Sequence, residues 1–126
     1  MIDDSLRIGD FTLNSRLILG TGRHRTSKEM VESITTSGTD VITVAIRRLD
    51  LENPGQSNIL DLIDQNRYKI LPNTAGCRVA EEALLTANLA RSLGLPNWVK
   101  LEVIPDPKYL MPDPIETMKA AELLIA

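Results

Sequence analysis

The stretch Val41-Ile42-Thr43-Val44-Ala45-Ile46 decides the fold class, because it is a nearly continuous run of apolar, mostly β-branched residues. Such a run is typical of a strand that is covered on both faces, as in a parallel sheet flanked by helices. A segment of helical period precedes it, with Ser27 in position to cap the helix and Gly38 in position to end it. The run and its neighbour therefore predict an α/β fold.

The same alternation of short apolar runs and longer helical segments extends along the chain in both directions. Leu6–Ile8 and Phe11–Leu13 flank Gly9-Asp10 and predict an N-terminal β-hairpin. Further strands are expected at Arg16–Leu19, Val41–Ile46, Tyr68–Leu71 and Trp98–Ile104, and helices at Asn58–Gln65, Val79–Leu93 and Ile115–Ala126, the last with Asp113 at its N-cap and Pro114 at its first position. Alternating strands and helices imply a parallel sheet with right-handed crossovers, so ligands are expected at the carboxyl ends of the strands.

The length predicts half of a barrel. A parallel (β/α) barrel of TIM type has eight strands and typically about 250 residues, whereas this chain has 126 residues and about four βα units after the hairpin. We therefore expect residues 1–126 to be a single partial domain, the N-terminal half of a (β/α)8 barrel whose C-terminal half is absent. Unpaired sheet edges would favour a homo-oligomer.

The composition excludes several classes of protein. The chain is 43% hydrophobic and 25% charged, which predicts a packed core, and its net charge of −3 without a basic stripe argues against a nucleic-acid partner. A single cysteine, Cys77, excludes an intrachain disulfide and a multi-cysteine metal site. No segment has the length and apolarity of a membrane span or a signal peptide. We expect a soluble, intracellular protein that uses no metal or cofactor.

Lys100 and Glu102 are the residues most suited to chemistry. In a strand Trp98, Lys100 and Glu102 would share one face and the aliphatic residues between them the other, so the charged pair would point into the barrel. A lysine attacks a carbonyl only as the neutral amine, and at an ordinary pKa near 10.4 about one lysine in 2,500 is neutral at pH 7. Desolvation in a barrel would raise that fraction, and a carboxylate two residues on could move protons. A Lys–Glu ion pair on an edge strand facing water is the alternative.

The loops at the same end hold further polar groups, each with a structural alternative. Asn73 and Thr74 could hydrogen-bond substrate or cap the following helix. Gly20-Thr21-Gly22 with Arg23, His24 and Arg25, and separately Arg47-Arg48, could attract an anion or form ordinary surface contacts. Cys77 has no visible catalytic partner and is expected to be a buried structural thiol.

Five stretches resemble bacterial and plastid thiazole synthase of thiamine biosynthesis, in matching order. They are Arg16–Gly22, Val41–Arg48, Leu71–Gly76, Trp98–Val103 and Leu110–Thr117. The resemblance covers essentially the whole chain and implies a (β/α)8 barrel of roughly twice this length, in the bacterial cytoplasm or the plastid stroma.

The resemblance also implies a reaction. The lysine of the family's Lys-Leu-Glu motif corresponds to Lys100 and would form an imine with the ketone of 1-deoxy-D-xylulose 5-phosphate; the glutamate, implicated in acid–base work, corresponds to Glu102. Sulfur would come from a thiocarboxylated sulfur-carrier protein, and dehydroglycine would supply the remaining carbon and nitrogen.

The sequence departs from the family in one respect, and two alternatives compete with the resemblance. The family's phosphate-binding groups and a second catalytic carboxylate lie in later segments that this chain does not contain, so we expect the chain alone to be inactive or nearly so. The alternatives are another Schiff-base barrel of the aldolase type, and a half-barrel that assembles or docks the sulfur carrier without turnover.

Overall fold

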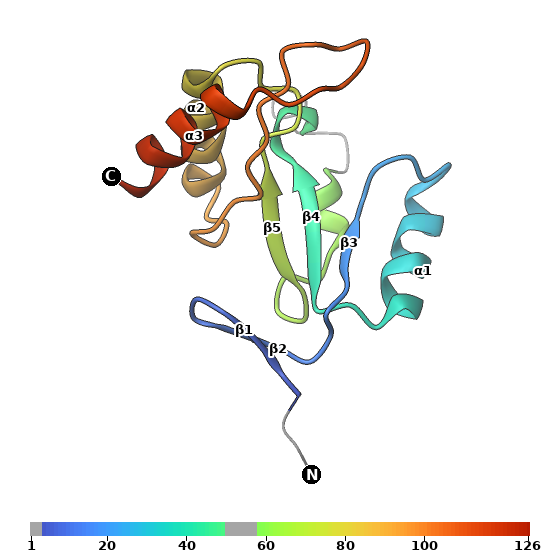
Figure 1. Cartoon of the computed structure of the whole chain (residues 1–126). Helices are drawn as coiled ribbons and strands as arrows, with labels where there is room; N and C mark the ends of the chain where they lie inside the picture. The colour runs from blue at the N-terminus through green and yellow to red at the C-terminus, as the bar shows by residue number, and fades with distance from the viewer. Residues whose placement is uncertain (1–3, 50–57) are drawn as a thin grey trace. The chain divides into compact units, whose positions relative to one another are not determined.

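The computed structural model describes residues 4–49 and 58–126, and the described residues form two compact units. The first unit contains residues 4–44 and 58–70, and the second contains residues 45–49 and 71–126. The loop expected at 47–57 lies largely outside the described residues. Figure 1 shows the course of the chain from the N-terminal hairpin to the C-terminal helix.

The N-terminal hairpin is confirmed. Strands β1 (Leu6–Ile8) and β2 (Phe11–Leu13) pair antiparallel, and Gly9 between them has φ 57°, a left-handed conformation that favours glycine. Leu13 is buried. The chain leaves β2 through Asn14, whose amide donates to the carboxylate of Asp40. This hydrogen bond connects the end of the hairpin to the residue that precedes β4.

Three strands form the central sheet in the order β3-β4-β5 (Figure 1): β3 (Ile18–Gly20), β4 (Val41–Ala45) and β5 (Lys69–Asn73). The pairing of β3 with β4 is parallel, which confirms the predicted class of sheet. The first four residues of β4 are all buried, as the continuous apolar run predicts. Strand β5 was expected to end before Pro72, but it continues through Asn73, because Pro72 lacks only a donor and its carbonyl still accepts from Lys100.

The helix of the first unit is α1 (Ser27–Ser37). It ends at Gly38, which has φ 66°, as predicted. The predicted cap at Ser27 is wrong by one residue: Thr26 has extended backbone and its hydroxyl accepts the amide of Glu29 at 3.1 Å. The helix expected at Asn58–Gln65 is a shorter 3-10 turn, η2 (Ile59–Leu62), capped by Asn58; a second such turn, η1 (Ile46–Arg48), belongs to the second unit.

In the second unit, α2 (Ala80–Ser92) packs against α3 (Pro114–Ile125). Asp113 caps α3 and Pro114 occupies its first turn, both as predicted. The core between these elements consists of small side chains and one valine: Cys77, Ala80, Ala83, Val103 and Ala120.

The described residues form no closed barrel. The predicted fourth strand, Trp98–Ile104, is extended but makes only one bridge, in which Lys100 pairs parallel with Asn73. The α/β class and parallel sheet are therefore confirmed, and the fourth strand is wrong as a full strand. No helix among the described residues has the length and apolarity needed to cross a membrane.

Candidate functional site

The segment 98–104 is fixed beside the end of β5 by backbone hydrogen bonds on both sides of Lys100. The amide of Lys100 donates to the carbonyl of Pro72 at 2.8 Å, and its carbonyl accepts the amide of Thr74 at 3.3 Å. In Figure 1 the segment is the orange trace that runs next to β5. Lys100 is therefore anchored through its backbone, and its side chain leaves from a defined point at the carboxyl end of β5.

The two faces of this segment differ as the alternation predicts. Val103 is fully buried and Leu101 packs against the core of Cys77 and the α2 and α3 alanines. Since side chains alternate along an extended backbone, Lys100 and Glu102 leave the opposite face. The aliphatic face therefore holds the segment on its helices and leaves the charged face available.

The lumen that would shelter Lys100 is not formed by the described residues. The Lys100 side chain is exposed and Glu102 is half-buried. Within residues 4–49 and 58–126, the Lys100 ammonium makes neither a hydrogen bond nor an ion pair, and it is not paired with Glu102. The edge-strand alternative predicted that Lys100 faces water in an ion pair with Glu102; the exposure agrees with that alternative, and the ion pair does not occur.

Thr74 joins the end of β5 to the backbone of Glu102. Its side chain is completely buried, and its hydroxyl accepts the amide of Glu102 and donates to the carbonyl of the same residue, both at 2.8 Å. A regular parallel ladder would place the carbonyl of Thr74 there, but that carbonyl accepts the amide of Cys77 in a turn. The hydroxyl replaces it, which is why the predicted fourth strand stops after one bridge.

Asn73 and Thr74 do not cap α2, so that alternative is wrong. The Asn73 side-chain oxygen accepts the amide of Ala75 at 3.1 Å and so forms a local turn, in which Asn73 is buried. The N-cap position of α2 is Val79, which supplies no side-chain hydrogen bond. The first amides are satisfied instead by the carboxylates of Glu82, which accepts from Arg78, and of Glu116, which accepts from Ala80.

Arg47 contacts the same region, the turn between β5 and α2 together with the start of α2. Its guanidinium donates to the carbonyl of Gly76 at 2.6 Å and contacts the Glu82 carboxylate at 3.2 Å. Gly76 has φ 90°, and an added Cβ there would lie 3.7 Å from the Arg47 side chain. Arg47 therefore braces the turn after β5, while the neighbouring Arg48 is exposed.

The Cys77 thiol is structural, as predicted. It is fully buried, and its sulfur lies 3.2 Å from the hydroxyl of Thr86. Its carbonyl accepts the amide of Ile104 at 2.9 Å, so Cys77 helps to hold the end of the segment that carries Lys100.

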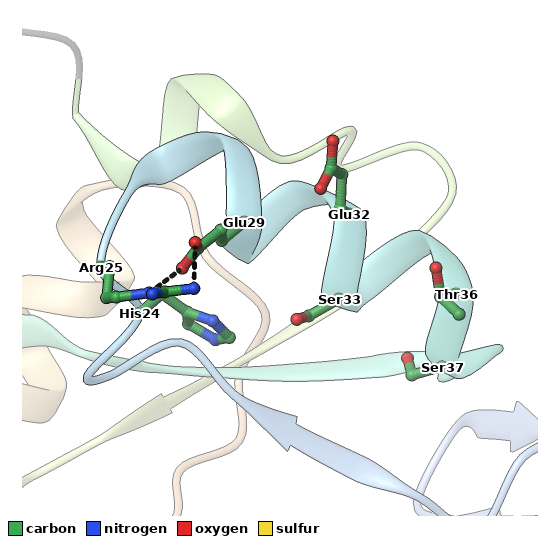
Figure 2. Close-up of a pocket in the computed structure, with 7 residues that line it drawn as sticks. All are labelled: His24, Arg25, Glu29, Glu32, Ser33, Thr36 and Ser37. Carbon is green, nitrogen blue, oxygen red and sulfur yellow. Dashed lines mark hydrogen bonds and ion pairs between the residues drawn. The ribbon is translucent and has the colours of Figure 1, made fainter.

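In the first unit, the turn after β3 borders an open surface pocket of about 570 Å³ beside α1 (Figure 2). Arg25, which precedes α1, is paired with Glu29 in the first turn of that helix at 2.8 Å. His24 belongs to no group of three or more potential metal ligands among the described residues. The Thr21 hydroxyl donates to the carbonyl of Thr43. Since Arg25 and Thr21 already have partners and the pocket is open, it does not resemble a built anion site.

Two carboxylates that stabilise the start of α2 are not predicted by the sequence analysis. Glu82 and Glu116 were not singled out, although both reach the start of α2. Glu82 follows the helix start at the spacing of an ordinary first-turn acid, a signal that was available. Glu116 lies 36 residues from Ala80, and no local pattern marks such a contact.

Comparison with known proteins assigns the chain a family. The family described as thiazole biosynthesis protein ThiG matches residues 7–126. The thiazole synthase of Syntrophobacter fumaroxidans is 55% identical over 124 residues, which cover 98% of this chain and 48% of that protein. The thiazole synthase of Rhodopirellula baltica is 52% identical, with coverage of 98% and 45%.

A solved structure is also similar. The Amycolatopsis orientalis BexX/CysO complex matches with a TM-score of 0.72 and 27% sequence identity, over 95% of this chain and 49% of that one. The chain thus spans about half the length of the curated relatives and of the solved chain that it matches.

Proposed function

The chain belongs to the ThiG family of thiazole biosynthesis proteins, and we propose that it carries the imine-forming lysine of a thiazole synthase, Lys100. The observation that carries the proposal is the position of Lys100: its backbone is fixed at the carboxyl end of β5, and its side chain lies on the face opposite the helix-packed Leu101 and Val103. Ligands of parallel α/β folds bind at that end of the strands.

The proposed step is a condensation with the ketone of 1-deoxy-D-xylulose 5-phosphate. The neutral Nζ of Lys100 attacks the carbonyl carbon and forms a C–N bond. The two protons of the amine nitrogen are transferred in turn to the carbonyl oxygen, the C–O bond breaks, and the oxygen leaves as water while the nitrogen becomes the imine. Glu102, two residues on and about 6.6 Å along the extended chain, is the proposed proton carrier for these steps.

We propose that the complete site is a (β/α)8 barrel of which residues 1–126 are the N-terminal half. The chain's coverage of about half of each relative supports this, as do the parallel sheet and the exposure of Lys100. Enclosure by the second half would desolvate the amine and favour its neutral, reactive form. Without that half the chain is expected to form little or no thiazole.

The proposed partners follow from the family. Sulfur would be delivered by a thiocarboxylated sulfur-carrier protein, and dehydroglycine would supply the remaining atoms of the ring. BexX was solved in complex with a second protein, CysO, which supports a protein partner for this chain. We further propose a homo-oligomer in the bacterial cytoplasm or plastid stroma, with substrate contacts from Asn73.

Borohydride trapping tests the proposal and separates it from its alternatives. The chain is incubated with 1-deoxy-D-xylulose 5-phosphate and sodium borohydride, and adducts are located by peptide mass spectrometry. We expect an adduct at Lys100 that Lys100→Ala abolishes. The matched control is Lys108→Ala, since Lys108 is also exposed and its loss should leave the adduct unchanged. Adducts with simple aldehydes alone would favour an aldolase-type barrel, and no adduct at Lys100 would favour a non-catalytic half-barrel.

A further inference from the structure

We infer that Thr74 is a positioning residue, whose hydroxyl sets the geometry of the Lys100–Glu102 face through the backbone of Glu102. The inference rests on the proposed function of Lys100. It differs from the role in substrate binding that the sequence suggested for Thr74, because the hydroxyl is turned away from solvent and both of its hydrogen bonds go to one residue of this chain.

The backbone of the segment has few other fixed points near the charged side chains. Lys100 is held by Pro72 and Thr74, and beyond Glu102 the next contacts are Ile104 with Cys77 and the Val103 carbonyl with Asp113. The peptide groups on either side of the Glu102 Cα are therefore held by a single hydroxyl. Glu102 has no other hydrogen bond or ion pair among the described residues.

Thr74 acts on both charged residues at once. Its amide donates to the carbonyl of Lys100, and its hydroxyl clamps Glu102. One buried residue at the end of β5 thus holds Lys100 through its backbone amide and Glu102 through its hydroxyl. Removal of the hydroxyl leaves the amide and carbonyl of Glu102 without partners in a partly buried place, and these groups would turn to find new ones.

A displaced segment would slow the chemistry more than it weakens the binding of the ketone. Rates that depend on near-attack geometry fall by about 100-fold for a displacement of about 1 Å. Thr74 makes its side-chain hydrogen bonds only to Glu102 and is buried, so it offers no group to the ketose phosphate, and the concentration that gives half-maximal trapping should change little.

The variants are Thr74→Val, which keeps the shape and loses the hydroxyl, and Thr74→Ser, which keeps the hydroxyl. The matched control is Thr86→Val, because Thr86 is also buried and its hydroxyl contacts Cys77 rather than Glu102. Each chain is titrated with 1-deoxy-D-xylulose 5-phosphate in the trapping assay, and amide hydrogen exchange is measured for the peptide that contains residues 98–104.

Thr74→Val is expected to lower the maximal rate of trapping at Lys100 by about 10- to 100-fold, with the half-saturating concentration within about twofold of its original value. Exchange in residues 98–104 should rise, Thr74→Ser should restore both readouts, and Thr86→Val should change neither. If Thr74→Val does not fold, the trapping rate and amide exchange of Thr74→Ala are compared with those of Thr74→Ser instead.

Two results would overturn the inference while the proposed function stands: an unchanged maximal rate in Thr74→Val, or a loss in Thr74→Ser equal to that of the hydroxyl-free variant. A rate loss shared by Thr86→Val would show a general effect of destabilisation and would also overturn it. If the unaltered chain gives no adduct at Lys100, the proposed function fails first and the inference falls with it.

Discussion

The turns that precede α1 and α2 both follow a strand of the same sheet, yet they are stabilised in opposite ways. The start of α1 is capped by its immediate neighbour, Thr26, and its ion pairs, such as Arg25 with Glu29, are one helical turn apart. The N-cap position of α2 supplies no side-chain hydrogen bond; Glu82 of the same helix accepts the amide of Arg78, and Glu116, from α3, accepts the amide of Ala80. The turn before α1 is stabilised by neighbouring residues, and its polar groups stay at the surface. The polar groups of the turn before α2 hold the segment that carries Lys100.

The largest effect on stability is expected from Glu116→Ala. The Glu116 carboxylate accepts the amide of Ala80 at 2.6 Å, and Ala80 is fully buried. Loss of a charge-assisted hydrogen bond that satisfies a buried donor should lower the free energy of unfolding by about 1.5–3 kcal/mol. Urea unfolding followed by the fluorescence of Trp98, the single tryptophan, which lies in the second unit, measures it.

Glu122→Ala is the matched control, because Glu122 is an exposed carboxylate on the same helix. It should shift the unfolding midpoint by a fraction of the Glu116→Ala shift, and Glu116→Gln, which keeps an acceptor oxygen, should fall between them. Equal shifts for Glu116→Ala and Glu122→Ala would mean that charge on α3, rather than the contact with Ala80, is what matters.

This contrast explains which features the sequence could predict. The hairpin around Gly9, the stop at Gly38 and the Asp113 cap depend on residues within a few positions of one another, and all three are observed. The burial of Val103 opposite Lys100 follows from simple alternation.

The errors have the opposite origin. A full strand at 98–104 was expected because its composition suits a strand, but its ladder depends on the Thr74 hydroxyl, 28 residues away. The start of α2 depends on Glu116 in the same way. The shelter proposed for Lys100 would come from a second half of the barrel, so alternation could assign the face of Lys100 but not its exposure.

A smaller effect is expected at the locally stabilised turn, where Thr26→Ala removes the hydroxyl that accepts the amide of Glu29. Loss of a threonine N-cap costs about 1 kcal/mol, and faster amide exchange confined to α1 is the direct readout. Thr36→Ala is the matched control: Thr36 is exposed on the same helix, and alanine is the better helix former there, so this variant should be neutral or slightly stabilising. Exchange that also rises in α2 would contradict the view that α1 is stabilised locally.

The smallest effect concerns the exposed ion pair of Glu81 on α2 with Lys119 on α3, whose atoms lie 2.5 Å apart. The hydrogen bond from Lys119 lowers the pKa of Glu81 below its ordinary 4.5, and the hydrogen bond to Glu81 raises the pKa of Lys119 above its ordinary 10.5. Because the carboxyl pKa is lower in the folded state, the stabilisation from Glu81 is full above the pKa of the unfolded state and is lost as the pH falls through the pKa of the folded state. Because the lysine pKa is higher in the folded state, the stabilisation from Lys119 is full below the pKa of the unfolded state and is lost as the pH rises through the pKa of the folded state.

The coupling between Glu81→Gln and Lys119→Gln in a double-mutant cycle should therefore be fully present between pH 4.5 and 10.5, and it should be lost progressively as the pH falls below 4.5 or rises above 10.5. Because both groups are exposed, it should also weaken in high salt. The local pair Lys28–Glu32 on α1, at 3.8 Å, is the comparison. Coupling at Glu81–Lys119 is expected to affect amide exchange in both α2 and α3, since it joins two helices, whereas coupling at Lys28–Glu32 should affect α1 alone. A Glu81–Lys119 coupling that survives acid would have to come from packing of the side-chain stems, and the contrast between local and distant ionic stabilisation would then lose one of its supports.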